Sequence, residues 1–248
     1  MPRSPRIDLP GLPQHVIVRG NDRMPIFRND ADRQRFLRYL VEAGEKNNCA
    51  IHAFVLMSNH VHLLLTGSSA GSLSNAMQSV GRRYARYFND ASQRTGTLFE
   101  GRFKSSLVET GRYFLTCMRY IELNPVRASM VGHPREYAWS SYSENAGGRP
   151  SGFLRPHPEY VRLGQDAQAR GRAYRALIEL GISEDELVAI RERARRNLPL
   201  GGEMFLDGVE ATTGRAARPR AVGRPVDDDG HASLDRREAC LTCPFSNG

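Results

Sequence analysis

The pattern of apolar and polar residues predicts four strands in the N-terminal half of the chain. Short apolar or alternating runs, bounded by Gly, Asn or Ser, are typical of strands in a packed sheet. The expected strands cover residues 15–20, 50–57, 60–67 and 97–109. Only Ser58 and Asn59 separate the second strand from the third, and a two-residue connection containing Asn favours a hairpin.

Elsewhere the apolar residues recur at steps of three and four, which predicts helices. These helices are expected over residues 30–47, 72–90 and 111–124. Asp30 or Asp32 is the expected N-cap of the first helix. Pro125 disfavours helical geometry in the residue before it, so the third helix should end near Asn124.

The resulting order, β-α-β-β-α-β followed by a further helix, predicts an α+β fold. It suits a ferredoxin-like, split β-α-β antiparallel sheet with helices packed on one face. We assign residues 1–144 to this domain. The composition then predicts a linker over residues 145–152, a helical extension over 153–211 and a mostly disordered tail over 212–248. A capping box at Ser183 and Glu186 marks the start of one helix of the extension.

The positive charge of the chain is concentrated in its first part. The formal net charge is +8, and residues 1–150 hold 20 Lys and Arg against 12 Asp and Glu. The remaining residues hold 15 of each, so they contribute no excess. All but two of the cations are Arg, whose planar guanidinium suits phosphate oxygens. This distribution predicts a polyanionic partner, with an ordinary solvated surface as the alternative.

Several classes of protein are not expected from this sequence. No apolar run approaches the ~18 residues that span a bilayer, and the first residues lack the apolar core of a signal peptide. We therefore expect a cytoplasmic protein without a membrane partner. Cys49 and Cys117 lie in apolar patterns typical of buried thiols. Cys240 and Cys243 have the spacing of a zinc knuckle or redox pair, but no second Cys or His pair lies nearby.

His60 and His62 lie one residue apart within an expected strand. Side chains two positions apart in a strand point to the same face, so the two imidazoles should lie side by side. Two neutral imidazoles at this spacing can share a metal ion. They are too few for a structural zinc site, so a metal would need a further ligand and would keep open positions. The alternative is a pair of core histidines, or an exposed pair on an edge strand.

Tyr120 and Asn124 lie four residues apart on the third expected helix and therefore share one of its faces. Beside a metal, such a phenol and carboxamide would supply a nucleophile and an oxygen ligand. The alternative is a half-buried tyrosine above a helix-capping asparagine. Tyr84 and Tyr87 lie on the apolar stripe of the second expected helix, so we expect both in the core.

Several blocks of sequence between Arg6 and Tyr142 form a recognisable series. They are "HVIVRGNDRMPIF" (15–27), "AFVLMSNHVHLLL" (53–65), "RYARYFN" (83–89), "GTLFEGRFKS" (96–105), "RYIELNPVRASMV" (119–131) and "YAWSSY" (137–142). In these blocks the chain resembles the IS200-like single-tyrosine (Y1) transposases, and most closely the REP-associated tyrosine transposases. Phe99 stands where many relatives carry Trp, which is a mild aromatic exchange.

The resemblance implies a metal-dependent transposase that cleaves and rejoins single-stranded DNA through a 5′-phosphotyrosine intermediate. The family's histidine–hydrophobic–histidine (HUH) motif falls on His60 and His62. Its nucleophile falls on Tyr120 and its further metal ligand on Asn124. The implied cofactor is a divalent metal, Mg²⁺ or Mn²⁺. Tyr84 also lies within a family pattern and is the competing nucleophile.

We expect phosphate contacts from basic residues on the second helix and on loops and strands near the histidines. They are Arg19, Arg23, Arg82, Arg83, Arg86, Arg102 and Lys104. The implied partner is single-stranded or hairpin DNA with repeat sequences, bound by a nucleoid-associated monomer or homodimer. Two alternatives stay open: a domesticated protein that binds hairpin DNA without strand transfer, and a metal-dependent nuclease that uses water.

Overall fold

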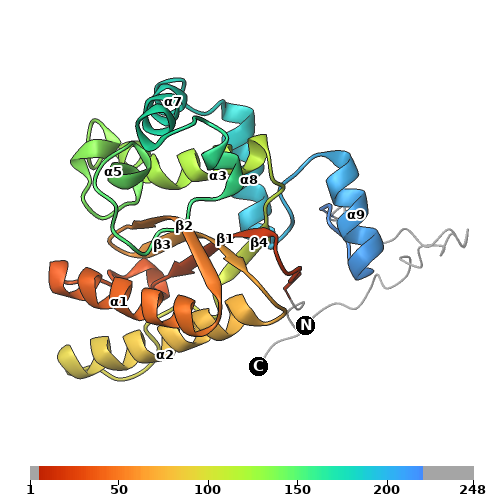
Figure 1. Cartoon of the computed structure of the whole chain (residues 1–248). Coiled ribbons are helices and arrows are strands. Elements are labelled where there is room, and N and C mark those ends of the chain that lie inside the picture. The colour runs from red at the N-terminus through yellow and green to blue at the C-terminus, as the bar shows by residue number, and fades with distance from the viewer. Residues whose placement is uncertain (1–5, 220–248) are drawn as a thin grey trace, which may run out of the picture.

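The computed structural model describes residues 6–219, and its centre is a four-stranded sheet (Figure 1). The strands are β1 (Pro13–Arg19), β2 (Cys49–Leu56), β3 (His60–Gly67) and β4 (Lys104–Leu107). Their order in the sheet is β2-β3-β1-β4, and every neighbouring pair is antiparallel. Each β-α-β crossover therefore has another strand inserted between its two strands, as in a ferredoxin-like sheet. The predicted α+β fold is confirmed, but helices pack on both faces of the sheet and not on one face as predicted, because the helix Arg112–Glu122 lies opposite the helices Asp30–Lys46 and Ser72–Ala91.

Helices cover both faces of this sheet. They are α1 (Asp30–Lys46), α2 (Ser72–Ala91), α3 (Arg112–Glu122), α4 (Asn124–Arg127), α5 (Tyr142–Asn145), α6 (Pro158–Val161), α7 (Ala167–Glu179), α8 (Glu184–Arg196) and α9 (Glu203–Thr213). Two short 3₁₀ turns, η1 (Asn21–Arg23) and η2 (Pro134–Glu136), lie in the connections. α8 begins with the predicted capping box, in which Ser183 and Glu186 each accept a main-chain N–H of the other.

The first face of the sheet packs against α1 and α2, which lie together beneath it in Figure 1. Alternate residues of β3, such as Val61 and Leu63, point to this face and are buried among apolar side chains of both helices. Phe36 of α1 and Tyr84 of α2 are fully buried there. Burying side chains of this size stabilises the fold by about 1.5–3 kcal/mol each, so this layer is an ordinary hydrophobic core.

The second face packs against α3, and the extension adds α7 and α8 to the same layer (Figure 1). Glu122 at the end of α3 is fully buried and links α3 to α5 and to α7 of the extension. Its carboxylate accepts hydrogen bonds from Ser141 Oγ at 2.5 Å, from Asn145 Nδ2 at 2.7 Å and from Tyr174 Oη at 2.7 Å. The extension thus continues the core of the N-terminal domain on the face that the predicted arrangement left open.

Later segments of the chain also lie along both edges of the sheet. At the β4 edge, Leu200 exchanges main-chain hydrogen bonds of 2.8 Å with Leu107 and Glu109. The β2 edge is paired in a similar way with residues 139–141 and with Arg155. The strand edges are therefore covered by the protein's own backbone.

Several predicted boundaries differ from the structure. The N-cap of α1 is Asn29, whose side chain accepts the main-chain N–H of Asp32 at 3.1 Å, and not Asp30 or Asp32. The fourth strand is shorter than predicted, because Phe99 forms only an isolated bridge. Pro125 does end α3, but it also occupies an early position in α4, where its missing N–H costs nothing.

The ends of the predicted segments also shift. Asn145 and Ala146 belong to the predicted linker but are buried in the core, so the connection begins after them. The predicted tail starts too early, because α9 runs to Thr213 and Ala217 is fully buried beside Leu107. Residues 220–248, with Cys240 and Cys243, lie outside the described residues. Within residues 6–219, no helix has the length and apolar character needed to cross a bilayer.

Candidate active site

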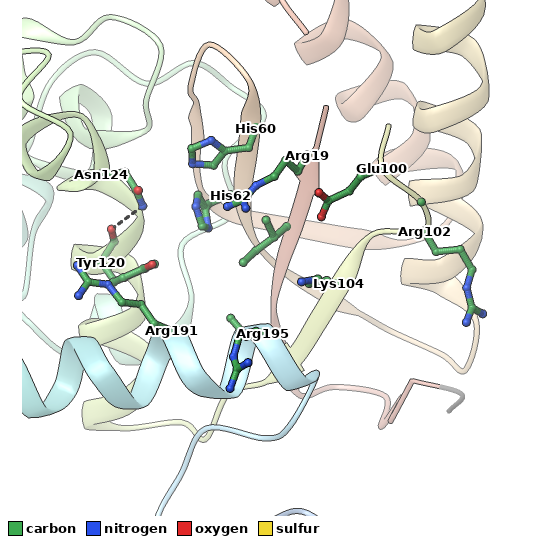
Figure 2. A pocket seen from close by; sticks show the side chains of 13 residues that line it. Arg19, His60, His62, Glu100, Arg102, Lys104, Tyr120, Asn124, Arg191 and Arg195 are labelled. Atoms are coloured by element: carbon green, nitrogen blue, oxygen red, sulfur yellow. Dashed lines mark hydrogen bonds between the residues drawn. The ribbon is translucent and has the colours of Figure 1, made fainter. Parts of the chain in front are cut away.

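A cavity of about 340 Å³ lies on the second face of the sheet, between β1, β3, α3 and α8 (Figure 2). Four predicted site residues line it: His60, His62, Tyr120 and Asn124. Two come from β3 and two from α3 and the start of α4. The structure therefore brings together in one place the imidazole pair and the phenol–carboxamide pair that the sequence spacing singled out separately.

The ring of His60 is held in a defined tautomer. Its Nδ1 lies 2.7 Å from Oδ1 of Asn59. An amide oxygen only accepts hydrogen bonds, so Nδ1 is the donor and Nε2 carries the lone pair. Burial, with a smaller effect from Arg19, lowers the pKa of His60 to about 4. The ring is therefore neutral at pH 7 and can bind a cation through Nε2.

A third histidine, His15 on β1, fixes the ring of His62. Nε2 of His15 and Nδ1 of His62 are 2.8 Å apart, and the two rings stack with centroids separated by 5.1 Å. This bond engages Nδ1 of His62 and leaves its Nε2 available. Burial lowers the pKa of His15 to about 3 and that of His62 well below its usual range, so both rings are neutral. A second histidine that orients a ligating one is common at metal sites.

The sequence pattern predicts that His15 lies in a strand, but it does not assign His15 to the site. Side chains of β1 alternate between the two faces of the sheet, so His15 and Ile17 point to the same face, and this alternation could have indicated His15. The missing information was the register: Ile17 pairs with His62, so His15 lies diagonally across from it. Register between strands distant in sequence is not encoded in either strand alone.

Tyr120 lies against the histidines and beneath a guanidinium. Its ring centroid is 5.7 Å from those of His15 and His62, both in edge-on geometry, and the residue is 7% exposed. The guanidinium carbon of Arg127 lies 4.2 Å from the same ring. Arg127 Nη2 also donates to the carbonyl oxygen of Tyr120 at 2.6 Å, whereas its Nη1 is buried with no hydrogen-bond partner among the described residues. Arg127 is not among the site residues that the sequence predicts.

Tyr84, the competing nucleophile, lies on the opposite face of the sheet. It is fully buried between α1 and α2, and its Oη donates to the carbonyl oxygen of Ile26 at 2.6 Å. Burial raises its pKa above the ordinary value for tyrosine. The structure therefore places Tyr84 in the core, as its position on the apolar stripe predicts, and away from His60 and His62.

The predicted DNA-contacting residues lie in three places: at the cavity, in η1 and on α2. Arg19, Arg102 and Lys104 line the cavity. Arg23 lies in η1 and does not line it. The others belong to α2 on the first face and are exposed: Arg82, Arg83 and Arg86. Two of these pair with carboxylates, Arg83 with Glu42 and Arg86 with Asp90. The site thus gathers only part of the predicted set, because helical periodicity does not tell which face of the sheet a helix covers.

The donor atoms at the cavity fit a divalent cation. Among residues 6–219, no three His, Cys, Asp or Glu side chains are grouped to hold a metal, so a site here requires mixed donors. Asn124 Nδ2 donates to the carbonyl oxygen of Tyr120 at 3.1 Å, which leaves Oδ1 as an acceptor. Two imidazole nitrogens and an amide oxygen suit an ion such as Mn²⁺ or Mg²⁺ that keeps open positions for substrate.

Among known protein families, one matches the part of the chain that forms the sheet. The family model described as "Transposase IS200 like" matches residues 9–124, slightly less than half of the chain. This range contains all four strands and the cavity residues of β3 and α3. No curated protein sequence matches the chain.

Solved structures with similar folds include two transposases. One is a REP-associated tyrosine transposase bound to a REP hairpin, with 18% sequence identity, covering 64% of this chain and 96% of the other, at a TM-score of 0.49. The second, from Deinococcus radiodurans and described as a transposase, has 16% identity, covers 52% and 92%, and has a TM-score of 0.35. Both structures are distant from this chain at these levels of identity. Over residues 9–124, the expected similarity to the IS200-like transposases is confirmed, and this similarity supports the expected enzyme class.

Proposed function

We propose that this protein is a metal-dependent single-stranded DNA transesterase that works through a 5′-phosphotyrosine on Tyr120. One observation carries the proposal. The Tyr120 ring lies 5.7 Å from the ring of His62, in a cavity that Asn124 also lines. The only other tyrosine with a claim to the role, Tyr84, has its hydroxyl sequestered in the opposite core.

The cavity residues have distinct roles in this reaction. His60, His62 and Asn124 would hold Mg²⁺ or Mn²⁺, which polarises the scissile phosphate and offsets its charge when bound. Arg127 stacks on the Tyr120 ring and donates to the main-chain carbonyl oxygen of the same residue, so it holds the ring beside the histidines. His15 holds His62 in the orientation that exposes Nε2 to the cavity.

The covalent step follows from these positions. The phenol oxygen of Tyr120 loses its proton and attacks phosphorus, the bond to the 3′-oxygen breaks, and the departing 3′-oxygen takes up a proton in turn, so a 5′-phosphotyrosine and a free 3′-hydroxyl result. A second 3′-hydroxyl can attack the phosphotyrosine, which restores Tyr120 and joins two DNA ends. All these groups belong to one chain, which supports catalysis by a monomer; a homodimer would contain two complete sites.

Hairpin or repeat DNA is the target class that we propose, as the family resemblance implies. The cations at the cavity support a nucleic-acid substrate: Arg19, Arg102 and Lys104 form no ion pair with any carboxylate among residues 6–219. Unpaired cations around a site that must bind a phosphodiester raise the local concentration of the anionic substrate.

Covalent trapping tests this function. The full chain is incubated with a labelled DNA hairpin carrying single-stranded flanks and with Mn²⁺, and products are separated on a denaturing gel. We expect a labelled protein adduct that Tyr120→Phe abolishes and that Tyr84→Phe retains. Cleavage without adduct in Tyr120→Phe would identify a nuclease that uses water. Binding without cleavage in the unmodified protein would identify a domesticated hairpin-binding protein.

A further inference from the structure

The helical extension contributes directly to the candidate active site. Arg191, Ala194 and Arg195 of α8 line the same cavity as Tyr120 and His62 (Figure 2). α8 buries its apolar side against the second core, and the two arginines project from a neighbouring side. They are four residues apart and so stack one turn from each other, about 6 Å along the helix axis.

Hydrogen bonds fix α8 in this position. Ser106 Oγ of β4 donates to the carbonyl oxygen of Arg193 at 3.2 Å. The main-chain N–H of Ser105 donates to Oδ1 of Asn197 at 3.1 Å. Arg193 Nη1 then donates to the carbonyl oxygen of Ala217 at 2.8 Å. α8 is therefore attached to the edge of the sheet through both main chain and side chains, so its arginines are held at the cavity.

A second and larger hollow, of about 890 Å³, continues from the first. The two share four lining residues: Glu100, Arg102, Lys104 and Arg195. The larger hollow then runs between the β4 region and the C-terminal end of α8, where Arg196 and Asn197 line it. We call the continuous depression formed by both hollows the β4–α8 groove.

The charge of the β4–α8 groove is strongly one-sided. Among the described residues, Glu100 is the single acidic one that lines either hollow. Arg102, Lys104 and Arg195 form no ion pair with any carboxylate in the described part of the chain. Arg191 and Arg196 do have acidic partners on α8, Glu184 at 3.6 Å and Glu192 at 3.5 Å. Three cations without carboxylate partners along one depression favour an extended polyanion over a small anion at one point.

We propose that the β4–α8 groove binds the backbone of single-stranded DNA next to the scissile phosphate, with Arg191 and Arg195 contacting successive phosphates. This inference rests on the proposed function, because it takes the substrate of the Tyr120 site as its ligand. The hollows have the volume of sites that take small groups, not a duplex. A positively charged groove that follows the backbone is typical of single-strand binding. The extension is thereby part of the substrate site.

The test measures binding in Tyr120→Phe protein, which cannot form the covalent product. Two labelled hairpins are compared by fluorescence anisotropy between 50 and 200 mM salt, one with a single-stranded flank and one without. The variants are Arg191→Ala with Arg195→Ala, and the control Arg172→Ala, an exposed arginine of α7 that lines neither hollow. Thermal melting of each variant verifies that it is folded.

We expect the double variant to bind the flanked hairpin more weakly and to lower the slope of log affinity against log salt by about 1.4, or ~0.7 for each lost phosphate contact. Its affinity for the hairpin without a flank should equal that of the parent, as should both affinities of Arg172→Ala. Arg195→Lys, which keeps the charge, should restore most of the slope that Arg195→Ala loses.

A double variant with the parent slope on the flanked hairpin would overturn the proposal, as would equal losses on both hairpins. Covalent trapping distinguishes this failure from failure of the proposed function. If the unmodified chain forms an adduct and the double variant binds the flank as the parent does, the groove proposal is rejected and the proposed function is kept. If flank binding depends on the two arginines but the unmodified chain forms no adduct, the groove proposal is kept and the proposed transesterase function is rejected.

Discussion

The two faces of the sheet bury comparable polar groups in opposite ways. On the first face, Asp32 is fully buried and paired with Arg28 at 2.7 Å, and Tyr84 donates to a main-chain carbonyl. On the second face, Tyr120 stands beside neutral histidines at a cavity, and Glu122 is fully buried and has no cationic partner among residues 6–219. Polar groups whose hydrogen bonds are all made stabilise a core. Groups that keep a free donor or lone pair at a cavity are available for chemistry.

The pKa values show the same contrast. Burial by itself would raise the pKa of Asp32, but the hydrogen bonds and charge of Arg28 outweigh it and lower the value to about 2. Burial raises the pKa of Glu122 to about 7, because its hydrogen bonds from Ser141, Asn145 and Tyr174 only partly offset the loss of water. Stability should therefore respond to pH in opposite directions on the two faces.

The largest expected effect is on covalent chemistry and separates the two tyrosines. Tyr120→Phe removes the nucleophile and should abolish the DNA adduct. Tyr84→Phe keeps the ring in the first core and should leave adduct yield unchanged. Denaturing gels with radiolabelled DNA measure both variants. A normal adduct in Tyr120→Phe, or loss of the adduct in a folded Tyr84→Phe protein, would contradict the assignment of the nucleophile to the second face of the sheet.

The next effect concerns the pH dependence of stability through Glu122. The folded pKa of about 7 lies above the ordinary value of 4.5. The stability that neutral Glu122 contributes is therefore complete below about pH 4.5 and is lost as pH rises through 7, with a total near 3 kcal/mol. Glu122→Gln should remove this slope, as urea unfolding at pH 4.5 and 8 can show.

Asp32→Asn provides the matched comparison on the first face. The folded pKa of Asp32 is depressed, so its contribution is present above the ordinary pKa of 3.8 and is lost as pH falls through 2. The variant should be destabilised at neutral pH and less sensitive to acid. Identical pH profiles for the Glu122 and Asp32 variants would contradict the opposite environments described for the two carboxylates.

A smaller effect is expected at His15, which acts through His62. His15→Ala should weaken Mn²⁺ binding by about 10–100-fold, because His62 loses the hydrogen bond that orients it. His15→Gln, which keeps a polar partner, should recover part of this affinity. Electron paramagnetic resonance of free Mn²⁺ measures binding without reference to DNA. His133→Ala is the control, because His133 lines no part of the cavity; full Mn²⁺ affinity in His15→Ala would show that packing alone orients His62.

The smallest effect is structural and confined to the first face. Tyr84→Phe leaves the carbonyl oxygen of Ile26 without its donor, which should lower the free energy of unfolding by about 1–2 kcal/mol. Chemical denaturation measures this loss. A change of similar size in Tyr120→Phe would mean that Tyr120 also has a structural role, because its position at the cavity predicts little contribution from its hydroxyl.

Local patterns predicted much of this molecule because they depend only on nearby residues. Alternation placed His60 and His62 on one face of β3, and the four-residue step placed Tyr120 beside Asn124. The remaining parts of the site depend on distant pairing. His15 needed the β1–β3 register, Arg127 needed the turn that follows Pro125, and Arg191 comes from a helix about 70 residues beyond the nucleophile. No periodicity within one element reports such contacts.

The backbone segments along the sheet edges have a consequence for assembly. Leu200 occupies the outer side of β4, and residues 139–141 with Arg155 occupy that of β2. An unpaired edge is the usual place where a second polypeptide adds a strand. Here neither edge can accept one unless the segment that covers it first detaches, so two copies of this protein that associate while folded must meet through their helices or loops.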